Sequence, residues 1–278
     1  MLIIGPARQN DTQWVYIWPC RKFSYSWDIH LENIVYDKVF QTEQNHWWFR
    51  TKRQLVLSLL KQHIVTSPQQ SARICDIGCG CGMMLQELKA ADYDGVGIDA
   101  SDMALDYCRQ RGVQAVKGLL PANVNLSDES VDGVLVLDVL EHIEDDGEAW
   151  AAAMKLLKPD GIAICTVPAC SWLWTQNDEY LQHKRRYNYH QLSSVVKSVQ
   201  NTEVLCLTYI NTFLFPLALI ERMALKLLPF RKETTGLAIP AWGVNYLLHK
   251  IYSAEIPLIN FGIRFPVGLS LLAVVRKS

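Results

Sequence analysis

A chain of 278 residues can bury a substantial core, and its 50% hydrophobic and 20% charged residues are typical of a globular protein. The formal net charge of −1 excludes a strong overall field that would attract nucleic acid, so we expect a small molecule or a local surface as the partner. One domain with an elaboration fits this length better than two independent domains.

The eight cysteines predict neither a zinc site nor a disulfide framework. Cys75, Cys79 and Cys81 are close together, but no second cysteine or histidine pair stands at the spacing that would complete a zinc site. We interpret most cysteines as small core residues in a reducing compartment, and we expect no resident metal. No secretory signal is evident, and the longest apolar run is shorter than the roughly 20 residues that a bilayer requires. We therefore expect a cytoplasmic protein.

The first 28 residues contain aromatic side chains without a sustained period and stay an unassigned extension. Residues 29–72 have the apolar spacing of two helices, which predicts an N-terminal helical cap. Trp47, Trp48 and Arg50 lie inside it, in the segment HWWFR. The tryptophans either frame a substrate together with Arg50 or are plain core.

Residues 73–100 contain the most informative stretch of the chain. An apolar strand, a glycine-rich turn, a helix and a second apolar strand follow one another there. The turn contains Gly78, Gly80 and Gly82, and the second strand ends on Asp99. Glycines let a backbone approach a ligand closely, and an acid at a strand end can bind both hydroxyls of a ribose. This pattern predicts half of a nucleotide-binding unit on a parallel sheet.

The spacing within the turn discriminates between cofactors. Dinucleotide sites favour Gly-x-Gly-x-x-Gly, and Met83 occupies the place of the third glycine. Asp76 adds a carboxylate that would repel a pyrophosphate and attract an ammonium group. S-adenosylmethionine carries an ammonium, a sulfonium and a ribose but no phosphate. The turn therefore favours S-adenosylmethionine over a nicotinamide dinucleotide, and a glycine-rich turn of some other α/β protein is the remaining alternative.

The alternation of strands and helices continues along the chain and predicts an α/β fold with a Rossmann-like, doubly wound, mainly parallel sheet of seven strands. Residues 73–211 and 266–278 would form its core, and residues 212–265 a helical insertion before the last strand. After residue 100 we expect strands at 113–116, 131–137, 162–167, 204–210 and 268–275, and helices at 104–111, 146–157, 190–199, 216–228 and 242–252.

The fourth strand ends in the turn Asp138 to His142, which should face the ligand crevice because the carboxyl ends of parallel strands do so. We expect Asp138 and Val139 beside the cofactor, and Glu141 and His142 as candidate catalytic residues. The alternative is that Glu141 and His142 merely open the next helix.

Residues 168–189 follow the fifth strand and combine acidic, aromatic and basic side chains, as a lid over an anionic substrate would. His183 is the candidate general base because its ordinary pKa lies near working pH. Arg185 or Arg186 could clamp a phosphate or carboxylate. The alternative is a network within the loop, in which its acids pair with its lysine and arginines. The aromatic candidates for substrate contact are Tyr180 and Tyr187.

The glycine turn and the turn DVLEH resemble those of class I S-adenosylmethionine-dependent methyltransferases. The segments HWWFR, HKRRY and PVGLSLLAVVRK resemble one bacterial and archaeal group of that class, whose substrates are mostly unknown. The resemblance covers residues 31–277. It implies that Asp76 binds the ammonium of the methionine end, that residues 78–82 line methionine and ribose, and that Asp99 binds the ribose hydroxyls.

Three further cofactor contacts belong to this resemblance. Cys79 lies within the turn, and Ala100 follows the ribose-binding acid. Relatives often place an acid near the adenine where this chain has Leu119, so the adenine contact stays open, with backbone groups near Leu119 as the substitute.

The resemblance implies methyl transfer to an oxygen, nitrogen or carbon nucleophile of a small or lipid- or glycan-linked acceptor, which the basic loop predicts to be anionic. The alternative is a non-catalytic module that binds S-adenosylmethionine or docks on a membrane. Residues 213–232 are apolar and end in positive charge, which predicts contact with the inner face of a membrane. A helix buried under the insertion or at a dimer contact would have the same pattern. The acceptor and the oligomeric state stay open.

Overall fold

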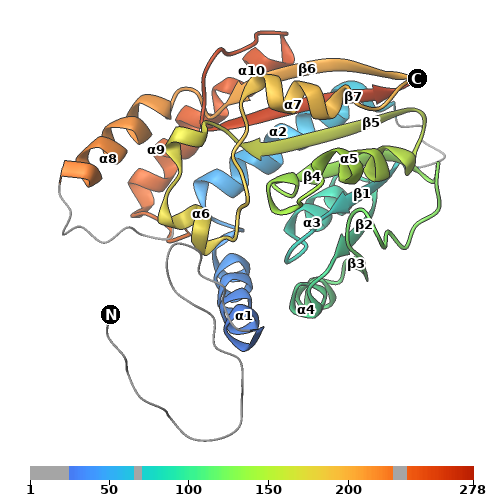
Figure 1. Ribbon diagram of the computed structural model, residues 1–278, viewed down its shortest axis with the longest axis horizontal. Helices are drawn as coiled ribbons and strands as arrows, with labels where there is room; N and C mark the ends of the chain where they lie inside the picture. The colour runs from blue at the N-terminus through green and yellow to red at the C-terminus, as the bar shows by residue number, and fades with distance from the viewer. Residues whose placement is uncertain (1–24, 66–70, 228–236) are drawn as a thin grey trace, which may run out of the picture.

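The computed structural model describes residues 25–65, 71–227 and 237–278, and it is built around one seven-stranded sheet (Figure 1). The strand order is β3-β2-β1-β4-β5-β7-β6, and β7 runs antiparallel to both of its neighbours. The predicted Rossmann-like, mainly parallel sheet of seven strands is thereby confirmed. Its strands are β1 (Arg73–Ile77), β2 (Asp94–Asp99), β3 (Gln114–Lys117), β4 (Val131–Leu137), β5 (Leu157–Pro168), β6 (Thr202–Ile210) and β7 (Ser270–Lys277).

The helices follow the predicted pattern with two additions, because α6 and α10 are too short to show a helical period in the sequence. The helix predicted at 146–157 ends earlier, at Lys155, and the strand predicted at 162–167 begins earlier, because β5 starts at Leu157. The α-helices are α1 (Tyr25–Thr42), α2 (Trp47–His63), α3 (Met83–Ala90), α4 (Asp102–Gln110), α5 (Asp146–Lys155), α6 (Gln176–Tyr180), α7 (Tyr189–Val196), α8 (Phe215–Leu227), α9 (Trp242–Ser253) and α10 (Glu255–Asn260).

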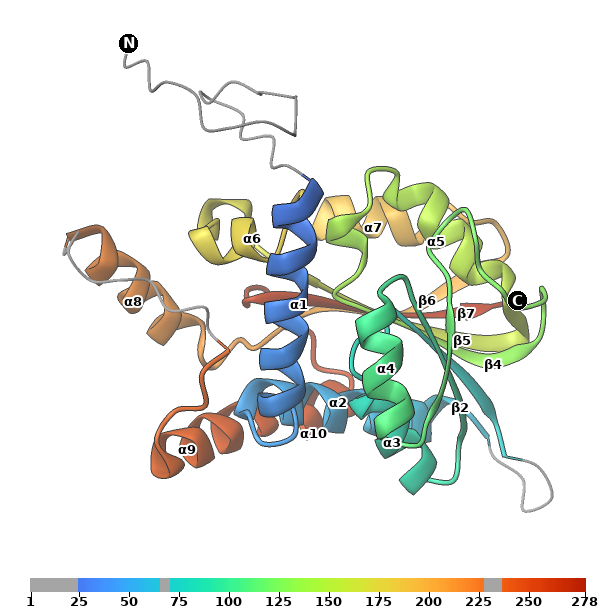
Figure 2. The same ribbon diagram turned by 90° about the horizontal axis from the view of Figure 1, so that it is seen from below.

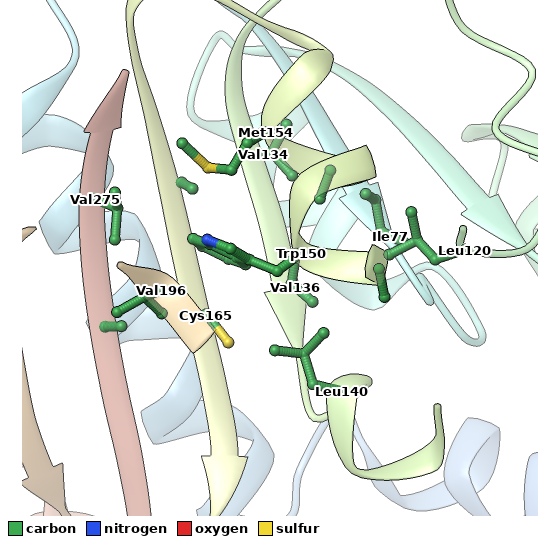
Figure 3. Packing of buried hydrophobic residues seen from close by; sticks show 14 of the residues in the cluster. Ile77, Leu120, Val134, Val136, Leu140, Trp150, Met154, Cys165, Val196 and Val275 are labelled. Atoms are coloured by element: carbon green, nitrogen blue, oxygen red, sulfur yellow. The ribbon is translucent and has the colours of Figure 1, made fainter. Parts of the chain in front are cut away.

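Helices cover both faces of the sheet, as a doubly wound fold requires (Figure 2). On one face, α5 inserts the fully buried Trp150 between Val134, Val136 and Val196 (Figure 3). On the other face, α2, α3 and α9 pack against the same strands. A near-continuous apolar strand such as β4 follows from this burial on two sides.

The N-terminal helices and the segment before β7 pack against each other, although about 200 residues separate them in the sequence (Figure 2). The backbone N–H of Trp47 donates to the side-chain oxygen of Asn245 at 2.9 Å, and Thr51 hydrogen bonds to His249 at 2.9 Å. The division into a cap, a core and an insertion stays a prediction. Three segments named in the predictions lie outside the described residues: most of the extension (1–24), the loop at 66–70 and residues 228–232.

Seven of the eight cysteines lie in the described ranges, and all seven are free thiols. Six are buried and Cys170 is half-buried, which confirms their interpretation as small core residues for this part of the chain. Within these ranges, no helix has the length and apolar character to cross a bilayer.

Candidate functional site

The glycine turn after β1 abuts the turn after β4. Gly78 has a φ of +68°, and a Cβ there would lie 2.5 Å from Cγ2 of Val139. Gly82, with a φ of +81°, stands just before α3. Any side chain at Gly78 would push these two turns apart, so glycine is required for their close approach. A Cβ at Gly80, in contrast, would meet no described atom within 4 Å, which leaves room for a ligand there.

Asp76 is a buried carboxyl group near the carboxyl end of β1. Its side chain is 2% exposed. Burial, then the nearby carboxylates of Asp99 and Glu43, raise its pKa to about 8. A carboxyl group in this state is stabilised by a cationic partner. The ammonium of an amino-acid ligand fits this requirement.

Asp99 ends β2 and is held by the backbone around it. Its carboxylate accepts hydrogen bonds from the N–H of Gly80 at 2.9 Å and of Ser101 at 3.0 Å, and from the hydroxyl of Tyr36 at 3.3 Å. Burial raises its pKa, while the backbone N–H groups of Ser101, Gly80 and Ala100 act in the opposite direction. The carboxylate is thus fixed at the strand end where ribose hydroxyls were expected. Tyr36 belongs to α1, and sequence reasoning missed it because the contact spans 63 residues.

Two of the expected cofactor contacts also make hydrogen bonds within the protein. The thiol of Cys79 lies 3.9 Å from that of Cys108 in the core, and its backbone N–H donates to Ile98. Leu119 exchanges two backbone hydrogen bonds with Asn123, so its N–H is used within the protein, while its side chain is exposed. The contacts of Cys79 and Leu119 with the cofactor stay predictions.

The turn after β4 holds an ion pair that the sequence did not predict. Asp138 has a φ of +56°, an uncommon value outside glycine, and its carboxylate accepts from Thr166 at 3.1 Å and from the ammonium of Lys52. Lys52 comes from α2, is 5% exposed and lies 4.0 Å from the ring centre of Trp48. Burial lowers the pKa of Lys52 to about 7, although the charge of Glu141 acts in the opposite direction. Only the fold brings this lysine to the turn.

Glu141, His142 and His183 converge beside this ion pair. Glu141 is fully buried, and neither of its carboxyl oxygens has a hydrogen-bond partner among the described residues. Burial raises the pKa of Glu141 to about 8, and burial followed by the charge of His183 lowers that of His142 to about 4. Nδ1 of His183 lies 2.9 Å from Oδ1 of Asp178. The three side chains offer ligand atoms within 4.8 Å of one another, so they are also the residues here that could hold a metal ion.

The basic side chains of the loop after β5 are paired, in part as the alternative interpretation expected: Arg186 pairs with Asp178 inside the loop, whereas Lys184 and Arg185 pair with acids outside it. Arg186 binds Asp178 through two hydrogen bonds, of 2.7 and 2.9 Å, and donates to the carbonyl of Ala169. Arg185 donates to Asp146 at 3.0 Å. Arg186 is therefore held inside the protein, whereas Arg185 is paired but remains 31% exposed.

The predicted substrate role of Tyr187 is wrong. Its side chain is 1% exposed, it packs in the core, and its hydroxyl donates to Asp146 at 2.7 Å. Tyr180 ends α6 and is half-buried, so it stays a candidate.

The two tryptophans of the segment HWWFR, Trp47 and Trp48, lie in different surroundings. Trp47 packs edge-on against the buried Tyr252 with ring centres 6.2 Å apart, as a core residue does. Trp48 instead covers Lys52 at the turn after β4. Arg50 lies two residues further along α2, half-buried, and contributes to lowering the pKa of His249.

The central part of the chain matches a known family model, described as a methyltransferase domain, over residues 75–165. A ubiquinone biosynthesis O-methyltransferase of Cereibacter sphaeroides is 32% identical over 104 residues, which cover 36% of this chain and 42% of the relative. A ubiquinone biosynthesis O-methyltransferase of Methylococcus capsulatus is 26% identical over 149 residues, covering 48% of this chain and 60% of the relative. The alignments thus span less than two thirds of these relatives.

A solved structure extends the similarity of the fold over nearly the whole chain. It is a SAM-dependent methyltransferase of Thermotoga maritima, described as a possible histamine N-methyltransferase, with a TM-score of 0.55 and 19% identity. The match covers 91% of this chain and 100% of that structure. At this identity the similarity supports the fold alone.

Proposed function

We propose that this chain, whose residues 75–165 form a class I S-adenosylmethionine-dependent methyltransferase domain, transfers the methyl group of S-adenosylmethionine to an acceptor bound beside the turn after β4. The observation that carries the proposal is the pair of buried carboxyl groups, Asp76 and Asp99, at the ends of β1 and β2. Burial raises the pKa of Asp76 to about 8, backbone N–H groups hold Asp99, and the glycine turn lies between them.

The bound cofactor supplies a methyl group that its sulfonium has already activated. In this proposal Asp76 gives up its proton and binds the ammonium, and Asp99 exchanges the hydroxyl of Tyr36 for those of the ribose. Gly78 and Gly80 let the backbone approach the ligand. The protein itself aligns the acceptor with the methyl group and excludes water from the site. Helices α1 and α2 lie beside the site.

On the acceptor side, His183 is the proposed base for a hydroxyl acceptor. Asp178 fixes the ring through Nδ1, which leaves Nε2 to take a proton. Arg186 in turn fixes Asp178. Glu141 and His142 complete this side of the site, and Trp48, Arg50 and Tyr180 are the remaining candidates for contact with the acceptor.

The acceptor is proposed to be an oxygen nucleophile on a lipid- or glycan-linked molecule. The curated relatives are named O-methyltransferases of ubiquinone biosynthesis, which supports an oxygen acceptor. The pairing of Arg185 and Arg186 within the protein weakens the expectation of an anionic group on it. Nucleic acid is not proposed as a partner because the net charge is −1.

Exposed apolar side chains on two helices support contact with a membrane surface. The outward side of α9 carries Trp242, Val244 and Leu247, which are 83%, 52% and 57% exposed. On α8, Leu217 and Ile220 are 54% and 64% exposed. Amphipathic aromatic and aliphatic residues of this kind favour the interface of a bilayer. We therefore propose a peripheral protein at the inner face of the membrane, as residues 213–232 already suggested.

Transfer of a labelled methyl group tests the proposal. The chain is incubated with S-adenosylmethionine labelled in the methyl group, together with lipid and glycan extracts, and the extracts are separated and counted. We expect label in an acceptor with the unaltered chain, and none with Asp99→Ala. Binding of S-adenosylhomocysteine without transfer to either extract would favour the non-catalytic module instead.

A separate variant tests the base. His183→Ala should reduce turnover while leaving binding of S-adenosylhomocysteine intact. Unchanged turnover of this variant at every pH would eliminate the role.

A further inference from the structure

We propose that Lys52 makes this chain reject amines as methyl acceptors, because its own ammonium fills a cation-binding cage beside the turn after β4. The cage consists of Asp138, Glu141 and Trp48. The ammonium pairs with the carboxylate of Asp138 and lies 4.0 Å from the ring centre of Trp48. Burial raises the pKa of Glu141, and the charge of Lys52 acts in the opposite direction, which places these two groups near each other. The inference rests on the proposed function, since it names the class of acceptor.

The three side chains of the cage have the chemistry by which proteins recognise organic cations. An indole ring attracts an ammonium to its face, and a carboxylate balances the positive charge. Both attractions are stronger where water is excluded, and Lys52 is buried. The ammonium of a lysine and that of a primary amine are the same chemical group. A cage that holds Lys52 is therefore also suited to an alkylammonium ion.

The cage lies where the acceptor is proposed to bind. Asp138 opens the turn after β4, and the neighbouring Val139 lies against Gly78 of the glycine turn. The side chain of Asp138 is 24% exposed, whereas that of Lys52 is 6% exposed. The carboxylate is thus reachable from outside the protein, but its cationic partner comes from inside.

Lys52 holds this place because it is tethered to α2. Trp48 and Lys52 are four residues apart on the helix, so both side chains lie on the same face. A tethered ammonium competes for Asp138 at a higher effective concentration than a free amine does. A second ammonium beside it would also be repelled. A hydroxyl acceptor carries no charge and does not need the cage, so the arrangement selects hydroxyl groups over amines.

Chemical complementation of a truncated lysine tests the cage without any methyl transfer. Lys52→Ala removes the outer part of the side chain, and n-propylamine has the same heavy atoms. At pH 6, where the amine is charged, a saturating concentration should raise the Tm of this variant by about 3 °C. The Tm of the unaltered chain should not change, and neutral n-propanol should have no effect on either protein. Lys158→Ala is the matched control, because Lys158 pairs with Asp132 at 2.8 Å but is 37% exposed, so the amine should not change its Tm.

Two results would overturn the cage. They are a Tm of Lys52→Ala that does not rise with n-propylamine, and an equal rise with n-propanol, since a filled hole would then explain the effect without recognition of a cation. If Lys52→Ala does not fold, Lys52→Val decides, because valine fills more of the space. Ethylamine then has the heavy atoms that are missing, and the same rise in Tm is expected.

The consequence for the acceptor is measured with S-adenosylmethionine labelled in its methyl group and with n-propylamine as the acceptor. In this transfer the amine nitrogen forms a bond to the methyl carbon, the bond from that carbon to sulfur breaks, and a proton of the ammonium passes to His183 and then to solvent. We expect about tenfold more label in the amine with Lys52→Ala than with the unaltered chain. Equal label with the two proteins, or none with either, would overturn the exclusion of amines.

Binding of S-adenosylhomocysteine, measured in parallel, separates this inference from the proposed function. Its absence in the unaltered chain would remove the proposed function and, with it, the exclusion of amines. The Tm measurements do not involve the cofactor, so the cage itself would still stand.

Discussion

The turns after β1 and β4 lie side by side, yet they are built in opposite ways. The turn after β1 and the acid that ends β2 come from residues 73–100, and neighbouring backbone N–H groups hold the carboxylate of Asp99, with one further donor from Tyr36. The turn after β4 depends on Lys52 from α2 and on His183 from the loop after β5. Short-range sequence therefore encodes the cofactor side, whereas long-range packing assembles the acceptor side.

We expect the largest effect of a substitution on the acceptor side of the site, which long-range packing assembles. Lys52→Met removes the cation that pairs with Asp138 and faces Glu141, and it leaves Asp138 without its cationic partner. Breaking a buried ion pair from one side costs about 3 kcal/mol of unfolding free energy. Urea unfolding followed by circular dichroism measures this loss. The double variant Lys52→Met with Asp138→Asn should recover part of it, and a single variant as stable as the unaltered chain would contradict the buried pair.

The next effect should fall on the cofactor side. Asp99→Ala removes the charged acceptor of two hydrogen bonds that the ribose hydroxyls donate, so the affinity for S-adenosylhomocysteine should fall about 100-fold, or about 2.7 kcal/mol. Calorimetric titration measures it. Asp102→Ala is the matched control, because Asp102 pairs with Lys117 at the exposed start of α4. Equal affinity of the two variants would remove Asp99 from the cofactor site.

A third variant connects pH with the buried acid of the glycine turn. The pKa of Asp76 is about 8 in the folded chain and 3.8 as an ordinary value, so the folded state holds this proton more tightly. Its contribution to stability is present at low pH and is lost as the pH rises through about 8. The variant Asp76→Asn has no titratable carboxyl group at this position, so it lacks this pH-dependent contribution. Its Tm should therefore fall less than that of the unaltered chain between pH 6 and 9, measured by differential scanning calorimetry.

The same variant should bind S-adenosylhomocysteine about tenfold more weakly, since it loses the charged partner of the ammonium. If the Tm of the variant and of the unaltered chain changed in parallel with pH, Asp76 would not hold this proton in the folded chain.

The smallest effect concerns the outward side of α9. Trp242→Ala combined with Leu247→Ala removes two exposed apolar side chains, and partitioning to vesicles with anionic lipid should weaken several-fold, or about 1 kcal/mol. Sedimentation with the vesicles measures it. Tyr189→Ala, exposed on α7, should not change it. Vesicle binding that is absent in the unaltered chain would rule out this surface as a membrane contact.

The sequence by itself determined the order of strands and helices and the character of the glycine turn. Apolar periods and the Asp76 to Asp99 spacing are local signals, and the sheet they predicted is the sheet observed. The tertiary structure decided which distant side chains reach the two sides of the site. Lys52 and Tyr36 reach the site across 86 and 63 residues, and Tyr187 and Arg186 turn inward to partners that no local pattern indicates. Burial and ion pairing depend on neighbours in space, and the spacing of residues along a chain does not fix those neighbours.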